Sequence, residues 1–417
     1  MAPLAPGGGT FARAWGEEQG PRVQRGTGSA MQSHASRHVV SEHLKDRFPL
    51  ADGGVFQQGV IPLEIARSYG RRGIPKLVDV LKYFLDPNAP AKPDVALALR
   101  VLRDELSNQE KKGQAITYGS CPVLTALLSN EDKEIRKLAC EVLASLATFF
   151  MGRLSMIQCG TIESLVPAVA TTTEEATACL KAIADGRDGA AALLESRAVS
   201  NEGIIGVVPN LVRVLEREDS SQAALVASLS TIASIATTDA GIYAALRARV
   251  LPVVLKLATG PKATAAVRAE CSGFVMQLCH HPYGKVQTIE TGGIALLAGV
   301  LGGDCLAQPV DTLLLATGGL MGLSTEIEGK LPIAEATFPQ MAQLLAHEHA
   351  NVSENARTVI KDACDEPAAY AIAKEVLDGD ALEAVFSPSI FPPGAGEFEA
   401  QEPQVGGMSL TDYAWGS

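Results

Sequence analysis

The feature that most constrains the fold is a pair of amphipathic helices expected between residues 206 and 236. The first has apolar residues at offsets of 0, 3, 4 and 7, which share one helical face: Val208, Leu211, Val212 and Leu215. The second follows a polar break at 216–221 and has apolar residues at offsets of 0, 4, 7 and 11, from Leu225 to Ala236. Two such helices cannot bury their apolar faces against each other alone, so the chain must supply more helices like them.

The beginning of this segment recurs along the chain at a nearly constant interval. A small residue or Gly precedes an apolar residue, which is followed by Pro or a substitute and, two positions later, by another apolar residue. The Pro-equivalent positions are 75, 122, 163, 209, 252, 295 and 339, with spacings of 47, 41, 46, 43, 43 and 44 residues. A period of about 40–47 residues is typical of armadillo and HEAT helical repeats.

The repeats resemble armadillo repeats more closely than HEAT repeats. The Gly before the Pro-Leu helix, as at Gly119, Gly160 and Gly206, is similar to the armadillo break between a short first helix and a second helix. A longer third helix is expected after each polar break, and Ser221 is placed to cap the one that follows it. The resemblance covers roughly residues 61–385 and implies an all-α, right-handed armadillo-type solenoid of about seven repeats.

Residues 1–60 and 386–417 lack this periodicity. The first segment is rich in Gly, Ala, Arg and Ser, and the second is acidic and rich in Pro and Gly, so we predict a disordered N-terminal extension and a disordered C-terminal tail. The sequence does not decide whether translation starts at Met1 or Met31. An organelle transit peptide would have a similar composition to the first segment, but Glu17 and Glu18 argue against it.

Charge and cysteine usage narrow the functional classes. The net charge is −12, of which the first 60 residues contribute +1, the tail −4 and the repeats about −9. An acidic solenoid lacks the basic stripe of a nucleic-acid-binding protein. The eight cysteines form no CxxC motif, which favours reduced, buried thiols in a cytosolic type of compartment. We also expect no membrane span, because no run of 18 apolar residues occurs.

The sequence contains no clear catalytic or metal-binding motif. The densest group of metal-type ligands is Cys271, Cys279, His280 and His281. Cys271 and Cys279 would lie about 12 Å apart along one helix, at 1.5 Å per residue, so they cannot share one ion. No Gly-x-Ser-x-Gly motif and no evident Cys–His pair occurs. We therefore predict no catalytic residue, no metal, no cofactor and no small-molecule substrate, and we expect that the protein is not an enzyme.

The third helices are expected to carry a protein-binding groove, as the armadillo resemblance implies. In the nuclear-import receptors an Asn of these helices binds a peptide backbone and a Trp packs on its side chains. The equivalent positions here are Ser145, Ala182, Ser234, Gln277, Gly322 and Asp362, and the repeats contain no Trp. We predict a smoother groove that receives a shaped protein surface, with these candidate binding residues: Ser145, Lys181, Ser234, Gln277 and Asp362.

The tail carries spaced aromatic residues that suggest a second binding element. They are Phe391, Phe398, Tyr413 and Trp415. Such a segment is either a plain disordered end or a docking segment that becomes ordered on a partner.

The beginning of the repeat region is similar to a narrower family, the radial-spoke head protein 14 family of cilia and flagella. The matching residues are Pro62, Ala66, Tyr69-Gly70-Arg71-Arg72 and Pro75-Lys76-Leu77. The resemblance implies a non-enzymatic structural subunit of the axoneme, with other radial-spoke proteins as partners. Two alternatives stay open: a soluble cytosolic armadillo adaptor for cargo or ubiquitin-ligase substrates, and a helical-repeat enzyme of the lyase type.

Overall fold

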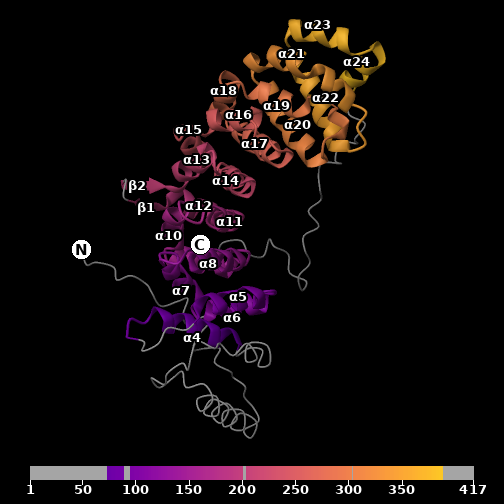
Figure 1. The fold of residues 1–417 in the computed structure, drawn as a ribbon. Coiled ribbons are helices and arrows are strands. Elements are labelled where there is room, and N and C mark those ends of the chain that lie inside the picture. Colours follow the sequence, from indigo (N-terminus) through magenta and orange to yellow (C-terminus); the bar gives the residue numbers. More distant parts are fainter. Residues whose placement is uncertain (1–72, 89–93, 201–202, 303, 388–417) are drawn as a thin grey trace, which may run out of the picture. The chain divides into compact units, whose positions relative to one another are not determined.

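The computed structural model describes residues 73–88, 94–200, 203–302 and 304–387 (Figure 1). The chain is an all-α, armadillo-type solenoid, as the repeat period predicted. It divides into two compact units, residues 1–142 (unit 1) and 143–417 (unit 2). No helix in the described ranges is both long and apolar enough to cross a lipid bilayer.

Within the residues of unit 1 that the structure describes, there are four complete helices and the first part of a fifth. They are α4 (Gly73–Leu85), α5 (Val95–Glu105), α6 (Gln109–Thr117), α7 (Ser120–Leu127) and α8 (Lys133–Ala147), which runs past residue 142. Helix α4 ends at Leu85, two residues before Pro87, which is the first of three prolines between α4 and α5. Asp94 then caps α5 by accepting a hydrogen bond from the Leu97 N–H at 2.9 Å.

Unit 2 repeats a pattern of a short first helix, a second helix and a longer third helix. The first helices are α9 (Phe150–Gln158), α12 (Arg187–Glu195), α15 (Asp239–Arg247) and α18 (Pro282–Glu290). The second helices are α10 (Thr161–Ala168), α13 (Val207–Glu216), α16 (Val250–Thr259) and α19 (Gly293–Leu301). The third helices are α11 (Thr173–Ala184), α14 (Gln222–Ile235), α17 (Ala265–Leu278) and α20 (Val310–Ser324).

The last repeat departs from this pattern. Its first two helices merge into one helix, α21 (Ile327–Leu344), which contains Pro332 and Pro339, and its third helix is α22 (Ala350–Ala363). The short 3-10 helix η4 (Cys305–Ala307) precedes α20. Helices α23 (Pro367–Val376) and α24 (Gly379–Phe386) follow α22 and pack against it. They cover a surface of α22 that would otherwise face water at this end of the repeats.

A hairpin interrupts the repeat that contains α12 and α13. Strands β1 (Arg197–Ser200) and β2 (Gly203–Gly206) pair antiparallel, with Arg197 opposite Gly206, and β1 packs against α10. The residues before the hairpin, although rich in Gly and Ala, form the regular helix α12.

A left-handed residue turns the chain into several second helices. Gly119, Gly160 and Gly292 have φ of 78°, 72° and 91°, and each immediately precedes a second helix. Glycine adopts this conformation without the steric cost that a Cβ brings. Arg249 takes the same position before α16 with φ of 56°. Gly206 does not, with φ of −82°, because it ends strand β2 and enters α13 from extended backbone.

Candidate functional site

The third helices of unit 2 form a continuous row. Each of α11, α14, α17 and α20 packs along its length against the next, and α20 packs against α22 (Figure 1). Residues such as Leu180, Leu229 and Val275 are fully buried and hold the row to the core. The opposite sides of these five helices, made of exposed and half-buried residues, form a surface that we call the ladder face.

The structure places four of the five candidate residues predicted from the sequence on this row. Lys181, Ser234, Gln277 and Asp362 lie in α11, α14, α17 and α22, and each is half-buried. Ser145 is also half-buried and lies near the end of α8. The periodicity therefore placed these side chains between core and solvent, where a partner can reach them. Their role in binding stays a prediction.

Small residues make the middle of the ladder face smooth. Apart from Gln222 at its start, the exposed and half-buried positions of α14 hold side chains no larger than valine: Ala223, Val226, Ser230, Ala233 and Ser234. On α20, a Cβ added to Gly318 would lie 3.2 Å from the Met276 sulfur, and one added to Gly322 would lie 2.7 Å from the Cys279 Cβ. These glycines let α20 approach α17 closely, and neither has a side chain that rises from the surface.

Glu270 is the most informative charge on the ladder face, and the sequence analysis missed it. It lies in α17, seven residues before Gln277 and therefore on the same side of the helix. Burial raises the pKa of its carboxyl; the Lys181 ammonium opposes this shift and Asp185 adds to it. Glu270 makes no hydrogen bond or ion pair with any other described residue. Heptad spacing from Gln277 is the signal that would have identified it.

A second carboxylate with a raised pKa, that of Asp362, lies in α22, the last helix of the row. Burial and the neighbouring Asp365 raise the pKa of Asp362, while Lys330 and Lys361 lower it. Lys330 is held at 2.7 Å from the Asp365 carboxylate. With Asp311 on α20 and Asp185 just after α11, both exposed, these groups give the ladder face acidic side chains at α11, α17, α20 and α22.

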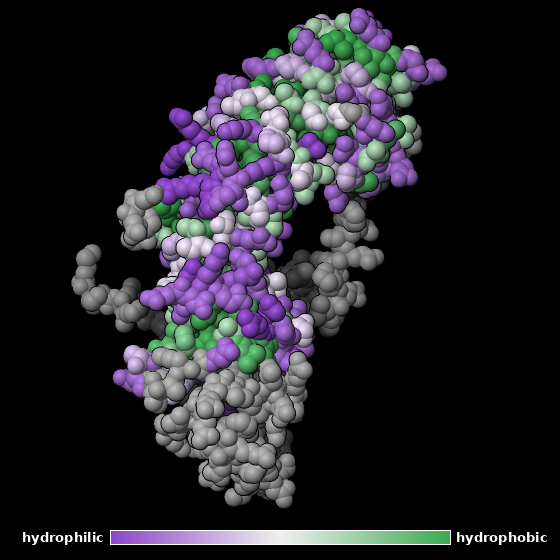
Figure 2. All heavy atoms as spheres, viewed as in Figure 1, coloured by the Kyte–Doolittle hydropathy of each residue, from purple (hydrophilic) through white to green (hydrophobic). Residues whose placement is uncertain are grey.

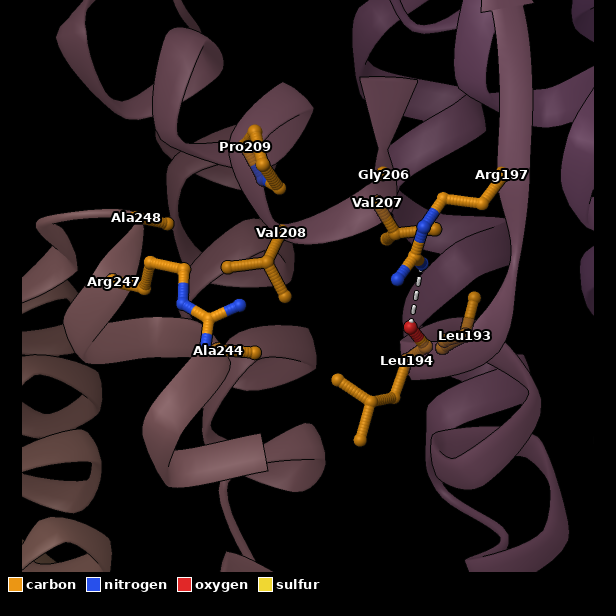
Figure 3. A pocket seen from close by; sticks show the side chains of 10 residues that line it. All are labelled: Leu193, Leu194, Arg197, Gly206, Val207, Val208, Pro209, Ala244, Arg247 and Ala248. Carbon is orange, nitrogen blue, oxygen red and sulfur yellow. Dashed lines mark hydrogen bonds between the residues drawn. The ribbon is translucent and has the colours of Figure 1, made fainter. Parts of the chain in front are cut away.

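A cavity of about 260 Å³ lies beside the hairpin, and none of the predicted binding residues lines it (Figure 3). It is lined by α12, β1, β2, α13 and α15, and we call it the hairpin pocket. Its apolar lining is Leu193, Leu194, Val207, Val208, Pro209, Ala244 and Ala248. The side chains of Arg197 and Arg247 lie on opposite sides of it. Hydrophilic residues cover the surface in this part of unit 2 (Figure 2).

A larger cavity, of about 430 Å³, lies between the end of α13 and α16. Lys262 closes one side of it by donating hydrogen bonds to the carbonyl oxygens of Arg217, at 3.1 Å, and Glu218. Its lining includes Glu216, Glu218 and Lys256. Because charges of both signs alternate around it, this cavity selects no single class of ligand.

An exposed aromatic cluster marks the first helices α15 and α18. The rings of Tyr243 and Tyr283 stack with centroids 5.9 Å apart, and the His281 ring meets Tyr243 edge-on at 5.1 Å. His281 also caps α18 by accepting a hydrogen bond from the Tyr283 N–H at 3.1 Å. The ring contacts and the cap together account for the positions of these side chains.

Most of the cysteines are buried, as is typical of structural rather than reactive cysteines. Burial raises the pKa of Cys271 and Cys279 to about 12, so both thiols are protonated at neutral pH and are poor nucleophiles. Within the described residues, no three His, Cys, Asp or Glu side chains come together in a way that could hold a metal ion. The aromatic tail residues Phe391, Phe398, Tyr413 and Trp415 lie outside the described residues.

Comparison with known proteins supports the fold. No protein-family model and no curated protein matches the chain. An engineered protein of known crystal structure is similar over 76% of this chain and 75% of that chain, with 21% identity and a TM-score of 0.65. A second engineered protein is similar over 60% of this chain and 96% of that chain, with 23% identity and a TM-score of 0.51.

Designed armadillo repeats also resemble the chain. A crystal structure of computationally designed armadillo repeat proteins for modular peptide recognition is similar over 69% of this chain and 99% of that chain, with 19% identity. Its TM-score of 0.41 is too low to support an argument about this chain. Solenoids of stacked helical repeats are a type of protein-binding scaffold, because stacking produces an extended binding surface.

Proposed function

We propose that this chain is a non-enzymatic scaffold for protein–protein interactions and that the ladder face is its partner surface. The observation that carries the proposal is Glu270, a half-buried carboxylate whose pKa is raised by burial and which has no hydrogen-bond or ion-pair partner in the described structure. Such a group costs folding stability, and residues that cost stability concentrate at functional sites. A basic group of a partner would offset that cost.

The partner class follows from the shape and charge of the face. The outer positions of α14 and the sites of Gly318 and Gly322 on α20 carry small side chains or none, and such a surface suits contact with a shaped protein surface. Carboxylates at Asp185, Glu270, Asp311 and Asp362 favour a partner that presents lysine or arginine side chains. Lys181 and Lys361 interrupt this acidic surface and would orient the partner by repelling its basic groups.

The more specific assignment is a structural radial-spoke subunit in the axoneme of a motile cilium or flagellum. What supports it is the sequence similarity at Pro62, Ala66, residues 69–72 and Pro75-Lys76-Leu77. The mechanism is geometric, because stacked repeats hold a rigid surface against which neighbouring subunits assemble. The partners would be other radial-spoke subunits, and the protein would reside in the ciliary cytoskeleton.

Salt extraction of isolated cilia tests this assignment. We expect the protein to stay with the microtubule axoneme through high salt, at a fixed ratio to radial-spoke proteins in quantitative mass spectrometry. Release with the soluble matrix, or absence from cilia, would contradict the axonemal role and favour a soluble armadillo adaptor.

Rebinding to axonemes that lack the protein tests the ladder face itself. The wild-type chain should bind to saturation, and the double variant Asp185→Lys/Asp311→Lys should bind at least roughly tenfold more weakly, because rim charges change association strongly. The control Glu328→Lys/Glu335→Lys makes the same change in net charge at exposed positions of α21. If both variants bind alike, the partner surface is not the ladder face.

A further inference from the structure

The hairpin pocket is a cavity separate from the ladder face, because none of its lining residues belongs to the third helices. It exists because β1 and β2 separate α12 from α13, where other repeats place a tight turn between their first and second helices. Val208, Leu194 and Ala244 lie between the two arginine side chains in the close view (Figure 3). The result is an apolar cavity with a guanidinium group on each side.

The two arginines have unused bonding capacity. Arg197 donates through Nη1 to the carbonyl oxygens of Leu194, at 2.9 Å, and Ser196, at 2.8 Å, which fixes its guanidinium beside the pocket. A guanidinium has five N–H donors, so others are available to a ligand. Arg247 is exposed and makes no hydrogen bond or ion pair with another described residue. No carboxylate is among the residues that line the pocket.

The size of the pocket limits the occupant. An apolar cavity of roughly 150 Å³ can hold a benzene ring. A volume of about 260 Å³ therefore accepts one aromatic side chain, and it is smaller than the pockets of most small-molecule ligands. The volume of the pocket and its two guanidinium groups therefore favour, as the occupant, one aromatic side chain with a carboxylate on either side.

The chain itself contains one segment of that description. Phe398 is the only aromatic residue in the sequence with an acidic residue on both sides, Glu397 and Glu399. Residues 388–417 contain four acidic residues and no Lys or Arg. The other tail aromatics do not fit, since Phe391 follows Ile390 and precedes Pro392, and Tyr413 has an acid on one side only.

We propose that the tail segment 396–400 docks in the hairpin pocket, with Phe398 in the apolar cavity and Glu397 and Glu399 at Arg197 and Arg247. The cavity accepts the ring, and the exposed arginine side chains at its rim can meet the carboxylates on either side of that ring. This proposal is independent of the axonemal assignment and of the ladder face.

Photo-crosslinking in the full-length protein tests the docking. The variant Phe398→p-benzoylphenylalanine is irradiated, and its crosslinked peptides are identified by mass spectrometry. We expect crosslinks concentrated in residues 193–197, 206–209 and 244–248. A mixture of isotopically light and heavy chains shows whether the tail docks within one chain or between two, and either result supports the proposal. Crosslinks distributed elsewhere, or the same yield at these segments from Phe391→p-benzoylphenylalanine, would overturn it.

A charge reversal provides the second readout. In the crosslinking variant, Arg247→Glu combined with Arg197→Glu should lower the pocket crosslink yield by roughly fivefold or more, since each ion pair becomes a repulsion. Adding Glu397→Arg and Glu399→Arg should restore it. If Arg197→Glu disturbs the hairpin, Arg247→Glu alone serves as the test, because Arg247 has no bond within the described structure to lose. A yield that is unchanged by the arginine reversals would contradict the proposed contacts.

Discussion

At the scale of single residues, a recurring glycine sets how closely successive repeats pack. Gly189, Gly241, Gly284 and Gly329 are each the third residue of a first helix or of its merged equivalent. A Cβ added at any of them would lie within 1.8–2.5 Å of a carbonyl oxygen near the end of the preceding third helix. The glycine therefore lets the first helix lie directly on the end of the helix before it.

Gly241→Ala should destabilise unit 2. The new Cβ would lie 1.8 Å from the Ile235 carbonyl oxygen, which is backbone and cannot rotate away, so α14 and α15 must separate. We expect a loss of about 1–3 kcal/mol, typical of overpacking, and a lower melting temperature by calorimetry. Gly299→Ala in α19 is the control, because no atom lies within 4 Å of its added Cβ. It should gain about 0.5–1 kcal/mol, and equal effects of the two substitutions would refute the packing argument.

Arg249→Gly should stabilise the fold. A left-handed conformation costs an L-residue roughly 1–2 kcal/mol, and glycine avoids this cost while losing more entropy on folding. The expected net gain is about 0.5–1 kcal/mol, measured as a higher urea midpoint. Arg247→Gly, two residues earlier and inside α15, should instead lose about 1 kcal/mol. A loss at both positions would show that the conformation of Arg249 carries no cost.

At the scale of elements, the sequence predicted the helices that follow the repeat period. It did not predict the elements that interrupt this period. The helices of the segment from Gly206 to Ala236 formed as expected, and Ser221 caps α14 by accepting from the Ala224 N–H at 3.2 Å. The hairpin at 197–206 was missed because strands this short contain too few residues to establish a period of two. The merged helix α21 was missed because Pro339, the repeat marker, is tolerated within a continuous helix.

The candidate site was predictable to the same extent. Gln277 and Asp362 lie on the row where the third-helix register predicted them, and in α11 the register gave Ala182, next to the candidate Lys181. The role of these residues in binding stays a prediction. The environment of Glu270 depends on Lys181 and Asp185, which lie in and just after α11, more than 80 positions earlier in the chain. The hairpin pocket depends on α12 and α15 meeting across an inserted element. Contacts of this kind follow from packing, which no local sequence pattern contains.

The Glu270→Gln substitution should change the stability of the fold in a pH-dependent way, because Glu270 is half-buried where α17 packs in the row of third helices. Burial raises the folded-state pKa of Glu270 above that of the unfolded chain, so its ionised form destabilises the fold at neutral pH. This penalty disappears as the pH falls through the folded pKa and then the unfolded pKa. The glutamine variant should therefore be the more stable at pH 7, and the difference in melting temperature should shrink towards pH 4. An unchanged difference across that range would argue against the burial effect; Glu335→Gln, at an exposed position, is the control.

At the scale of the whole molecule, the repeats form two kinds of surface, the ladder face and the hairpin pocket. The ladder face is made by third helices in succession, so its length and charge belong to the stack and to no single repeat. The hairpin pocket belongs to one irregular repeat and so provides a single site. A scaffold with both can hold a broad partner on the row of helices while a short acidic segment occupies the pocket. The two surfaces should respond to different substitutions.

Carboxylate footprinting by mass spectrometry, on the free protein and on the protein in its native assembly, shows whether the ladder face is the partner surface. We expect that Asp185, Glu270, Asp311 and Asp362 lose reactivity in the assembly, because a partner covers the ladder face. Glu328 and Glu335 on α21 should react equally in both samples. Protection of the α21 residues with unchanged reactivity on the ladder face would show that the protein binds through another surface.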